Sequence, residues 1–471
     1  MSRFSYGVTP ELAARVRKAG GARRWWQAEL NAGTADPGAG QIDGWWPDLD
    51  DDPGRLWINS RARGSDRTGY KVMIDYQRWC LARRIVADRQ PREVMTEFWE
   101  NLFNVPTLGD PSFVQRFDYG QTIRRNAFAS YETILTAAVT HPAMLLYLDQ
   151  CSSTKEHPIE NLGRELLELH TVGRGAYDES EVVASARILT GWLVRTAFKT
   201  SDMASWDRYY DPAEHWTGTV RVMGFSDANR DPRDTGLLGR YLRYLARHER
   251  TALRVAQRLA VKFVSDTPSR RLVENLARVY LANDTEIVPV LEALVSDREF
   301  QGAVGRKVRD PGEDIVATHR ALGSRMSKPR TDDDAAQVTL YQSSLMGQTP
   351  FSWPRPDGSP IDNASWSTPA RMLGSFKVHH NLAHGAWPNR GVTYRSASSW
   401  LPPLPARFSQ VVDHLSRQIL HRPASDRLIR ACAAATGQQP GETVTSGHPV
   451  AHAQLDLVLT TILDSPEHLA R

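Results

Sequence analysis

Residues 161–173, NLGRELLELHTVG, are the stretch that decides the fold. At helical pitch Leu162, Leu166 and Leu169 lie on one face, because positions three and four apart are neighbours on a helix surface. The polar residues of the stretch share the opposite face, and Gly173 stands where a left-handed cap ends a helix. We therefore expect an amphipathic central helix that packs its leucines into a core, with the rest of the chain as its support.

The chain around this stretch is patterned mainly for helices. Residues 69–103 are a long amphipathic stretch, broken near its middle by a proline, and residues 121–135 also have helical spacing. Asp178 with Glu181 three residues later is the signature of a capping box, which opens a helix. These patterns predict a mainly α fold built as one large multi-helix domain.

A small β-hairpin insertion is expected at residues 206–225. Residues 219–223 alternate and are bracketed by glycines, which is typical of a short strand next to tight turns. We expect a main helical domain over residues 1–325, a linker and packing segment over 326–384, and a proline-rich connector with C-terminal helices over 385–471.

Composition bounds the class of protein. The chain has 471 residues, 41% hydrophobic and 24% charged, and its 58 basic and 54 acidic residues are interspersed, which gives a net charge of +4. No strong field for a polyanion is implied, so we expect no nucleic-acid partner. Cys80, Cys151 and Cys432 are too few and too scattered for a disulfide framework or a zinc site.

The sequence also bears on location. No stretch approaches the roughly 18 uninterrupted apolar residues of a transmembrane helix, and the first residues have no apolar core of the length that a secretory signal needs. We expect a protein that is cytoplasmic by sequence, unless it is exported together with a partner.

The polar face of the central helix is the first candidate site. Glu165 and Glu168 predict a general acid/base pair, with Arg164 as a charge stabiliser, because a carboxylate near a guanidinium stays ionised while a more buried one keeps its proton. The alternative is an ion pair between Arg164 and Glu168, with Asn161 and Glu165 anchoring neighbouring loops.

A metal site is the weaker interpretation of the same helix. Glu165, Glu168 and His170 all have suitable ligand atoms, but positions 168 and 170 point in different directions on a regular helix. We therefore expect no metal and no cofactor. A nucleophilic triad is also disfavoured, because no Gly-x-Ser-x-Gly elbow or glycine-rich phosphate loop is present.

Two other segments are expected to complete a cleft over the central helix. Glu100 and Asn104 lie one turn apart at the end of an aromatic helix, although Asn104 could instead cap that helix. Residues 211–216 lie in the non-helical insertion, whose aromatic side chains suit sugar rings but equally suit packing in a chain with 14 tryptophans. The predicted substrate-binding residues are Glu100, Asn101, Asn104, Asn161, His170, Trp192, His215 and Trp216.

Six motifs occur in one order along the chain. They are FWENLFN at 98–104, HPAMLLYL at 141–148, the central stretch at 161–173, ARILTGW at 186–192, FVSD at 263–266 and LMGQTP at 345–350. Together they resemble the domain of unknown function 1800 family of bacteria, over nearly the whole chain. The segment HWTGTV at 215–220 is similar to its actinobacterial members.

The resemblance implies a mainly helical fold, frequent export of other members, and frequent genomic pairing with a family that looks like a sulfatase or phosphatase relative. This sequence departs from the family at two points. Glu100 and Leu102 stand where many members carry histidines, and no N-terminal export signal is visible.

These observations lead to two functional hypotheses. The first is a hydrolase that acts on a glycan or another cell-envelope polymer through a cleft containing Glu165, Glu168 and Arg164. The second is a non-catalytic accessory protein that binds an exported sulfatase-like partner, its charged stripe being an internal ion-pair network.

Overall fold

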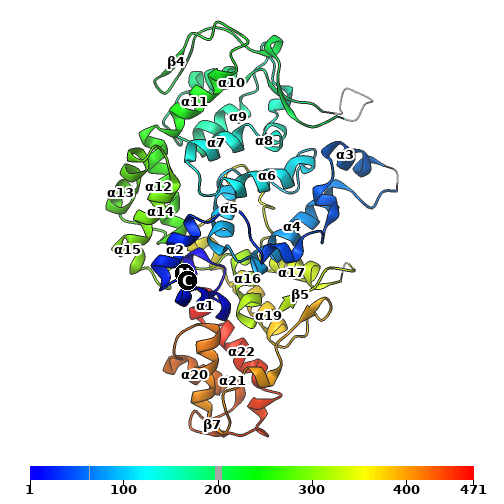
Figure 1. Ribbon diagram of the computed structural model, residues 1–471, viewed down its shortest axis with the longest axis vertical. Coiled ribbons are helices and arrows are strands. Elements are labelled where there is room, and N and C mark those ends of the chain that lie inside the picture. Colours follow the sequence, from blue (N-terminus) through cyan, green and yellow to red (C-terminus); the bar gives the residue numbers. More distant parts are fainter. Residues whose placement is uncertain (63, 197–203, 332) are drawn as a thin grey trace.

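The computed structural model describes residues 1–62, 64–196, 204–331 and 333–471, and it is mainly α-helical, as predicted (Figure 1). The first half of the chain contains α1 (Pro10–Lys18), α2 (Ala22–Leu30), α3 (Pro53–Arg61), α4 (Gly69–Val86), α5 (Gln90–Leu102), α6 (Phe113–Arg125), α7 (Tyr131–Val139), α8 (Pro142–Tyr147), α9 (Glu160–Glu165), η5 (Leu166–His170) and α10 (Glu179–Leu189).

The second half continues with α11 (Gly236–Ala246), α12 (Glu249–Phe263), α13 (Arg270–Ala282), α14 (Ile287–Ser296), α15 (Arg298–Gln301), α16 (Pro311–Leu322), α17 (Ala335–Leu345), α18 (Asn363–Trp366), α19 (Pro369–Ala383), α20 (Phe408–Ile419), α21 (Asp426–Thr436), α22 (Leu455–Leu463) and α23 (Pro466–Leu469). No helix among the described residues is long and apolar enough to cross a membrane.

The helices are stacked along one long axis (Figure 1). The upper end in that view holds α7 to α11, the middle holds α1, α2, α4, α5 and α12 to α17, and the lower end holds α20 to α22. One continuous cluster of buried apolar side chains runs from Phe4 to Leu463, so the layers share a core. The C-terminal end lies beside α1 and α2, where Arg471 pairs with Lys307 through their backbones.

Strands are short and occur in pairs. The predicted hairpin is confirmed as β3 (Val220–Val222) and β4 (Phe225–Asp227), which pair antiparallel. Met223 and Gly224 between them both have positive φ, as a tight hairpin turn requires. The other antiparallel pairs are β1 (Trp192–Val194) with β2 (Arg208–Tyr210), β5 (Arg325–Met326) with β6 (Val392–Thr393), and β7 (Ala406–Arg407) with β8 (Thr443–Val444).

Helix boundaries follow their local signals. The break expected inside residues 69–103 separates α4 from α5, and the capping box of Asp178 and Glu181 opens α10. The single helix expected over residues 121–135 is wrong. α6 ends at Arg125, and Ser130 starts α7 by accepting a hydrogen bond from a backbone N–H of its first turn.

The central stretch is helical but irregular. α9 gives way at Leu166 to the wider π-helical turn η5, in which successive residues are rotated relative to an α-helix. Leu162 and Leu166 are fully buried, as predicted, but Leu167 and not Leu169 takes the third buried position. Gly173 has φ +87°, so the left-handed end of the segment is confirmed.

Candidate functional site

Close packing of α9 on α10 fixes the position of the central stretch. Gly163 faces the backbone of α10, and a Cβ at this position would lie 2.9 Å from the backbone nitrogen of Ala186. The Ser185 hydroxyl also donates to the Gly163 carbonyl oxygen at 3.2 Å. This contact holds the last turn of α9, which ends at Glu165, at a set distance from α10.

Glu168 is a carboxylate held in its ionised form. Its side chain is 15% exposed, pairs with the Arg174 guanidinium and accepts a hydrogen bond from the Tyr177 hydroxyl at 3.0 Å. Burial by itself favours the protonated form, but the hydrogen bonds from Arg174 and Tyr177 outweigh it and hold the pKa of Glu168 below its usual value.

Glu165 has the opposite environment. Its side chain is half-buried, and within the described residues its carboxylate has no hydrogen bond and no ion pair. Burial, and then the negative charge of Glu168, raise the pKa of Glu165. Two carboxylates three residues apart thus have pKa values shifted in opposite directions, which is the arrangement that separates a general acid from an ionised carboxylate.

Two arginines of α12 lie near the central stretch. Arg254 donates from Nε to the Leu169 carbonyl oxygen at 3.0 Å, and its charge interacts with Glu168. Arg258, one turn further on, has a buried Nε with no hydrogen-bond partner in the described structure. Burial and the charge of Arg254 lower the pKa of Arg258 to about 10, so it remains a cation at neutral pH.

The loop of residues 353–359 lies on the other side of the carboxylates. Its Asp357 contributes to the raised pKa of both Glu165 and Tyr147, and its charge also interacts with Arg258. The Tyr147 hydroxyl donates to the Pro354 carbonyl oxygen at 3.0 Å. Residues from α8, η5 and this loop therefore approach Glu165.

Asn101 and Asn104 hold that loop in place. The Asn104 amide donates to the carbonyl oxygens of Trp353 and Arg355 at 2.9 and 2.8 Å. Asn101 donates to the Ser359 carbonyl oxygen at 2.9 Å and accepts from its backbone N–H at 2.7 Å. Both amides are therefore engaged with backbone groups, which makes them positioning residues for the loop.

A polar cavity lies under the loop. Its free volume is about 20 Å³, and its lining includes Arg84, Glu97, Asn104, Lys262 and Asp310. A cavity of that size holds a water molecule but no sugar ring. Asn104 therefore does not open into a substrate cleft on this side.

Glu100 is sealed inside the protein. Its carboxylate accepts from Arg116 Nη1 at 2.8 Å and from the Tyr76 hydroxyl at 3.0 Å, and the side chains of the ion pair are no more than 1% exposed. His170 is also buried, against the Phe103 ring, and burial followed by the charge of Arg254 lowers its pKa to about 3. Both residues are enclosed in the core near the site and do not line an open cleft.

The expected ion pair between Arg164 and Glu168 is wrong. Arg164 instead binds Glu179 of the next helix at 2.6 Å and Glu160 at 3.1 Å. The π-helical turn after Glu165 displaces Glu168 from the position that a regular helix would give it, and Arg174 takes it up instead. Asn161, exposed at the start of the stretch, donates to Asp149 at 2.9 Å.

The insertion residues form a separate group. His215 is buried, with Nδ1 2.8 Å from the Thr190 carbonyl oxygen and Nε2 2.9 Å from Asn229 Oδ1. Trp216 lies under the Arg187 guanidinium, and Trp192 packs on Tyr210 across β1 and β2. Among the described residues, none of these contacts involves Glu165 or Glu168.

Arg254, Arg258 and Asp357 are the residues of this site that sequence reasoning missed. The two arginines lie one helical turn apart on an otherwise amphipathic helix, a pattern visible in TALRVAQRLA at residues 251–260. Asp357 lies in the turn cluster WPRPDG at residues 353–358. Nothing local to either segment indicates that both approach residue 165.

Comparisons with known proteins identify the family of this chain. No curated protein and no solved structure matches the chain. The model of one family, described as protein of unknown function (DUF1800), matches residues 1–470. The chain therefore belongs to the DUF1800 family.

Proposed function

We propose that this protein is a hydrolase that acts on a glycan or another cell-envelope polymer. Glu165 is the general acid that protonates the leaving-group oxygen, and Glu168 is the ionised carboxylate that acts as base or nucleophile. The observation that carries the proposal is the opposite shift of the two pKa values, together with the unpaired carboxylate of Glu165.

We assign the stabilisation of negative charge that develops on the substrate to two arginines of α12. Arg164 is engaged by Glu160 and Glu179 on the outer side of the helix, whereas Arg258 keeps an Nε–H without a partner in the described structure. A guanidinium N–H that is already desolvated stabilises negative charge that develops on a substrate without first having to lose water. Arg258 and its neighbour Arg254 thus take the role first expected of Arg164.

The test is hydrolysis of purified bacterial cell-wall polysaccharides, followed by the release of reducing ends. Wild type, Glu165→Gln and Glu168→Gln are compared with Glu160→Gln, a matched substitution on the same helix. We expect each of the first two substitutions to lower the rate by about 100-fold or more, and Glu160→Gln to leave it unchanged. Equal rates for wild type and Glu165→Gln would refute the assignment.

The pH profile gives a second readout. Activity requires a protonated Glu165, so it is lost as pH rises through the raised pKa of Glu165. It also requires an ionised Glu168, so it is lost as pH falls through the lowered pKa of Glu168. The shifts in opposite directions predict a broad plateau, and Glu165→Gln should abolish its alkaline limb.

A second candidate is a non-catalytic accessory protein that binds a sulfatase-like or phosphatase-like partner and is exported with it. The observation that favours it is the pairing of Arg164 and Glu168 with other side chains. Copurification from the native host distinguishes the two functions. A stable complex whose polymer hydrolysis is unaffected by Glu165→Gln supports the accessory function.

A further inference from the structure

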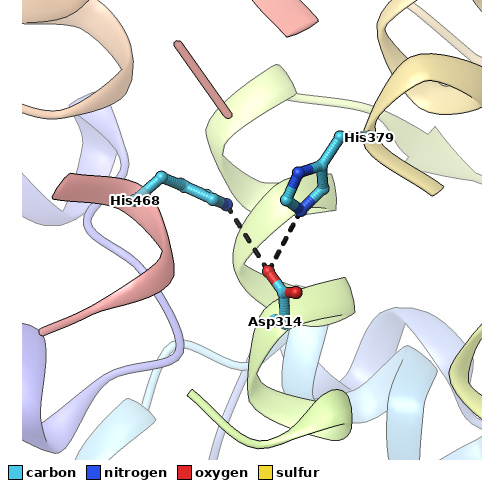
Figure 2. Close-up of side chains that lie close together, drawn as sticks. All are labelled: Asp314, His379 and His468. Carbon is cyan, nitrogen blue, oxygen red and sulfur yellow. Dashed lines mark hydrogen bonds and ion pairs between the residues drawn. The ribbon is translucent and has the colours of Figure 1, made fainter. Parts of the chain in front are cut away.

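Three buried metal-ligand side chains converge on one point far from Glu165 in the sequence. Asp314 comes from α16, His379 from α19 and His468 from α23, and Figure 2 shows both imidazole rings turned toward the carboxylate. Nε2 of His379 and Nε2 of His468 lie 3.1 and 3.8 Å from Asp314 Oδ1. The three ligand atoms are all within 4.8 Å of one another.

Two further polar atoms, Nδ1 of His379 and the second carboxylate oxygen of Asp314, are engaged by other residues. Nδ1 of His379 lies 2.7 Å from Asp464 Oδ1. The second oxygen of Asp314 accepts from Arg371 Nη2 at 3.0 Å and from the Ser375 hydroxyl. Metal-binding histidines in proteins usually donate their other N–H to a carboxylate, and metal-binding carboxylates are themselves hydrogen-bonded, so the outer contacts orient the three atoms as they would for a metal.

The distances between the ligand atoms are also compatible with an ion. At 3.8 Å, Nε2 of His468 is too far from Asp314 Oδ1 for a hydrogen bond, although the ring points at that oxygen. Ligand atoms about 2.1 Å from a tetrahedral zinc ion are about 3.4 Å from one another. The observed separations of 3.1 and 3.8 Å lie on either side of that value.

The competing explanation for this cluster is a protonated His379, with no metal ion. Burial lowers the pKa of His379, but Asp314 and Asp464 outweigh it and raise the pKa to about 9, so the ring can bridge both carboxylates as an imidazolium. In that case His468 donates to or accepts from the Thr318 hydroxyl, 3.1 Å away. Metal and proton are alternatives for the same atoms, and metal content distinguishes them.

One member of the cluster borders a pocket. His468 borders a pocket of about 470 Å³, whose lining also includes Arg309, Ala317, His421 and Arg422. Three protein ligands leave the fourth position of a tetrahedral ion for water or a small anion. The arginines of the pocket favour an anionic occupant.

We propose that Asp314, His379 and His468 bind one divalent zinc ion, whose fourth position is left for water or a small anion. Two imidazoles and one carboxylate are a ligand set suited to Zn²⁺, in contrast to the oxygen-only sites of Mg²⁺ and Ca²⁺. The site does not depend on the proposed hydrolase function, because it uses none of the residues around Glu165.

The experiment is metal analysis of the full chain purified without chelator, followed by removal of metal and calorimetric titration with ZnCl₂. We expect close to one zinc per chain and a single tight site in the titration. Zinc should also raise the Tm of the stripped wild type, because a ligand that binds the native state stabilises it. Co²⁺ in place of zinc should give the visible absorption bands of a four-coordinate site.

Substitutions of the ligand residues test where the ion binds. His468→Gln and His379→Gln should abolish binding, and Asp464→Asn should weaken it by about 10- to 100-fold through loss of the outer contact. The matched control is His380→Gln, the exposed neighbour on α19, which should bind as wild type does. Wild type that neither contains zinc nor binds it in the titration, or zinc binding that survives both His468→Gln and His379→Gln, would overturn the proposal.

Discussion

Replacement of Glu100 by glutamine should strongly destabilise the fold. The substitution keeps the shape of the side chain but leaves the Arg116 guanidinium, 0% exposed, without its charge partner at 2.8 Å. Arg116 cannot leave, because its Nε donates to the Val105 carbonyl oxygen at 2.7 Å. Breaking a buried ion pair by removing one partner costs about 3–5 kcal/mol. That is about a fifth or more of the free energy of unfolding of a typical domain, which is about 5–15 kcal/mol.

The assay is urea unfolding followed by tryptophan fluorescence and circular dichroism. The matched control is Glu156→Gln, whose ion pair with Lys155 is about half exposed and should contribute less than about 1 kcal/mol. Glu100→Gln should shift the midpoint to lower urea with an unchanged slope. A loss below about 1 kcal/mol for Glu100→Gln would refute the view that Glu100 is a structural ion-pair residue and would reopen its assignment to substrate binding.

Three further predictions concern stability and reactivity. Gly163→Ala should cost about 1–3 kcal/mol in urea unfolding, because its Cβ overpacks the α9–α10 contact, and an unchanged midpoint would contradict that packing. Iodoacetamide at pH 8 should leave Cys80 and Cys432 unmodified in the native protein but not in urea, since burial raises the pKa of both thiols to about 12. The pKa of Glu165 is higher in the folded protein than in the unfolded chain, so its contribution to stability falls as pH rises above its pKa in the unfolded chain. Glu165→Gln should therefore raise the Tm at pH 7. The pKa of Glu168 is lowered in the folded protein, so Glu168→Gln should lower the Tm at pH 7. Changes in Tm of the same sign for the two variants would contradict the opposite environments of the two carboxylates.

The sequence predicts those parts of the fold that depend on neighbouring residues. Asp178 and Glu181 close a capping box, and the burial of Leu162 and Leu166 follows helical spacing. The π-helical turn does not follow from spacing, because the same residues satisfy a regular helix equally well. Leu167 becomes buried only because packing of the whole domain favours the wider turn.

The candidate site likewise contains residues that a local sequence pattern predicts and residues that it does not predict. Glu165 and Glu168 are adjacent along one helix, so a local pattern is enough to single them out. Arg254 and Asp357 are brought to them from segments about 90 and 190 residues further on. Residue type alone cannot predict such contacts, and it cannot predict that Asp314, His379 and His468 meet, since no two of them share a motif.

The attachment of the 353–359 loop to Asn101 and Asn104 has a consequence for biosynthesis. Asp357 follows Glu168 by 189 residues, so the growing chain exposes the carboxylates well before the loop that covers them exists. At the usual rates of translation that interval is about 10 to 40 s. During it, the side chains of Asn101 and Asn104 bind water in place of the loop, and a chaperone that recognises this region would act on the nascent chain before the site is complete.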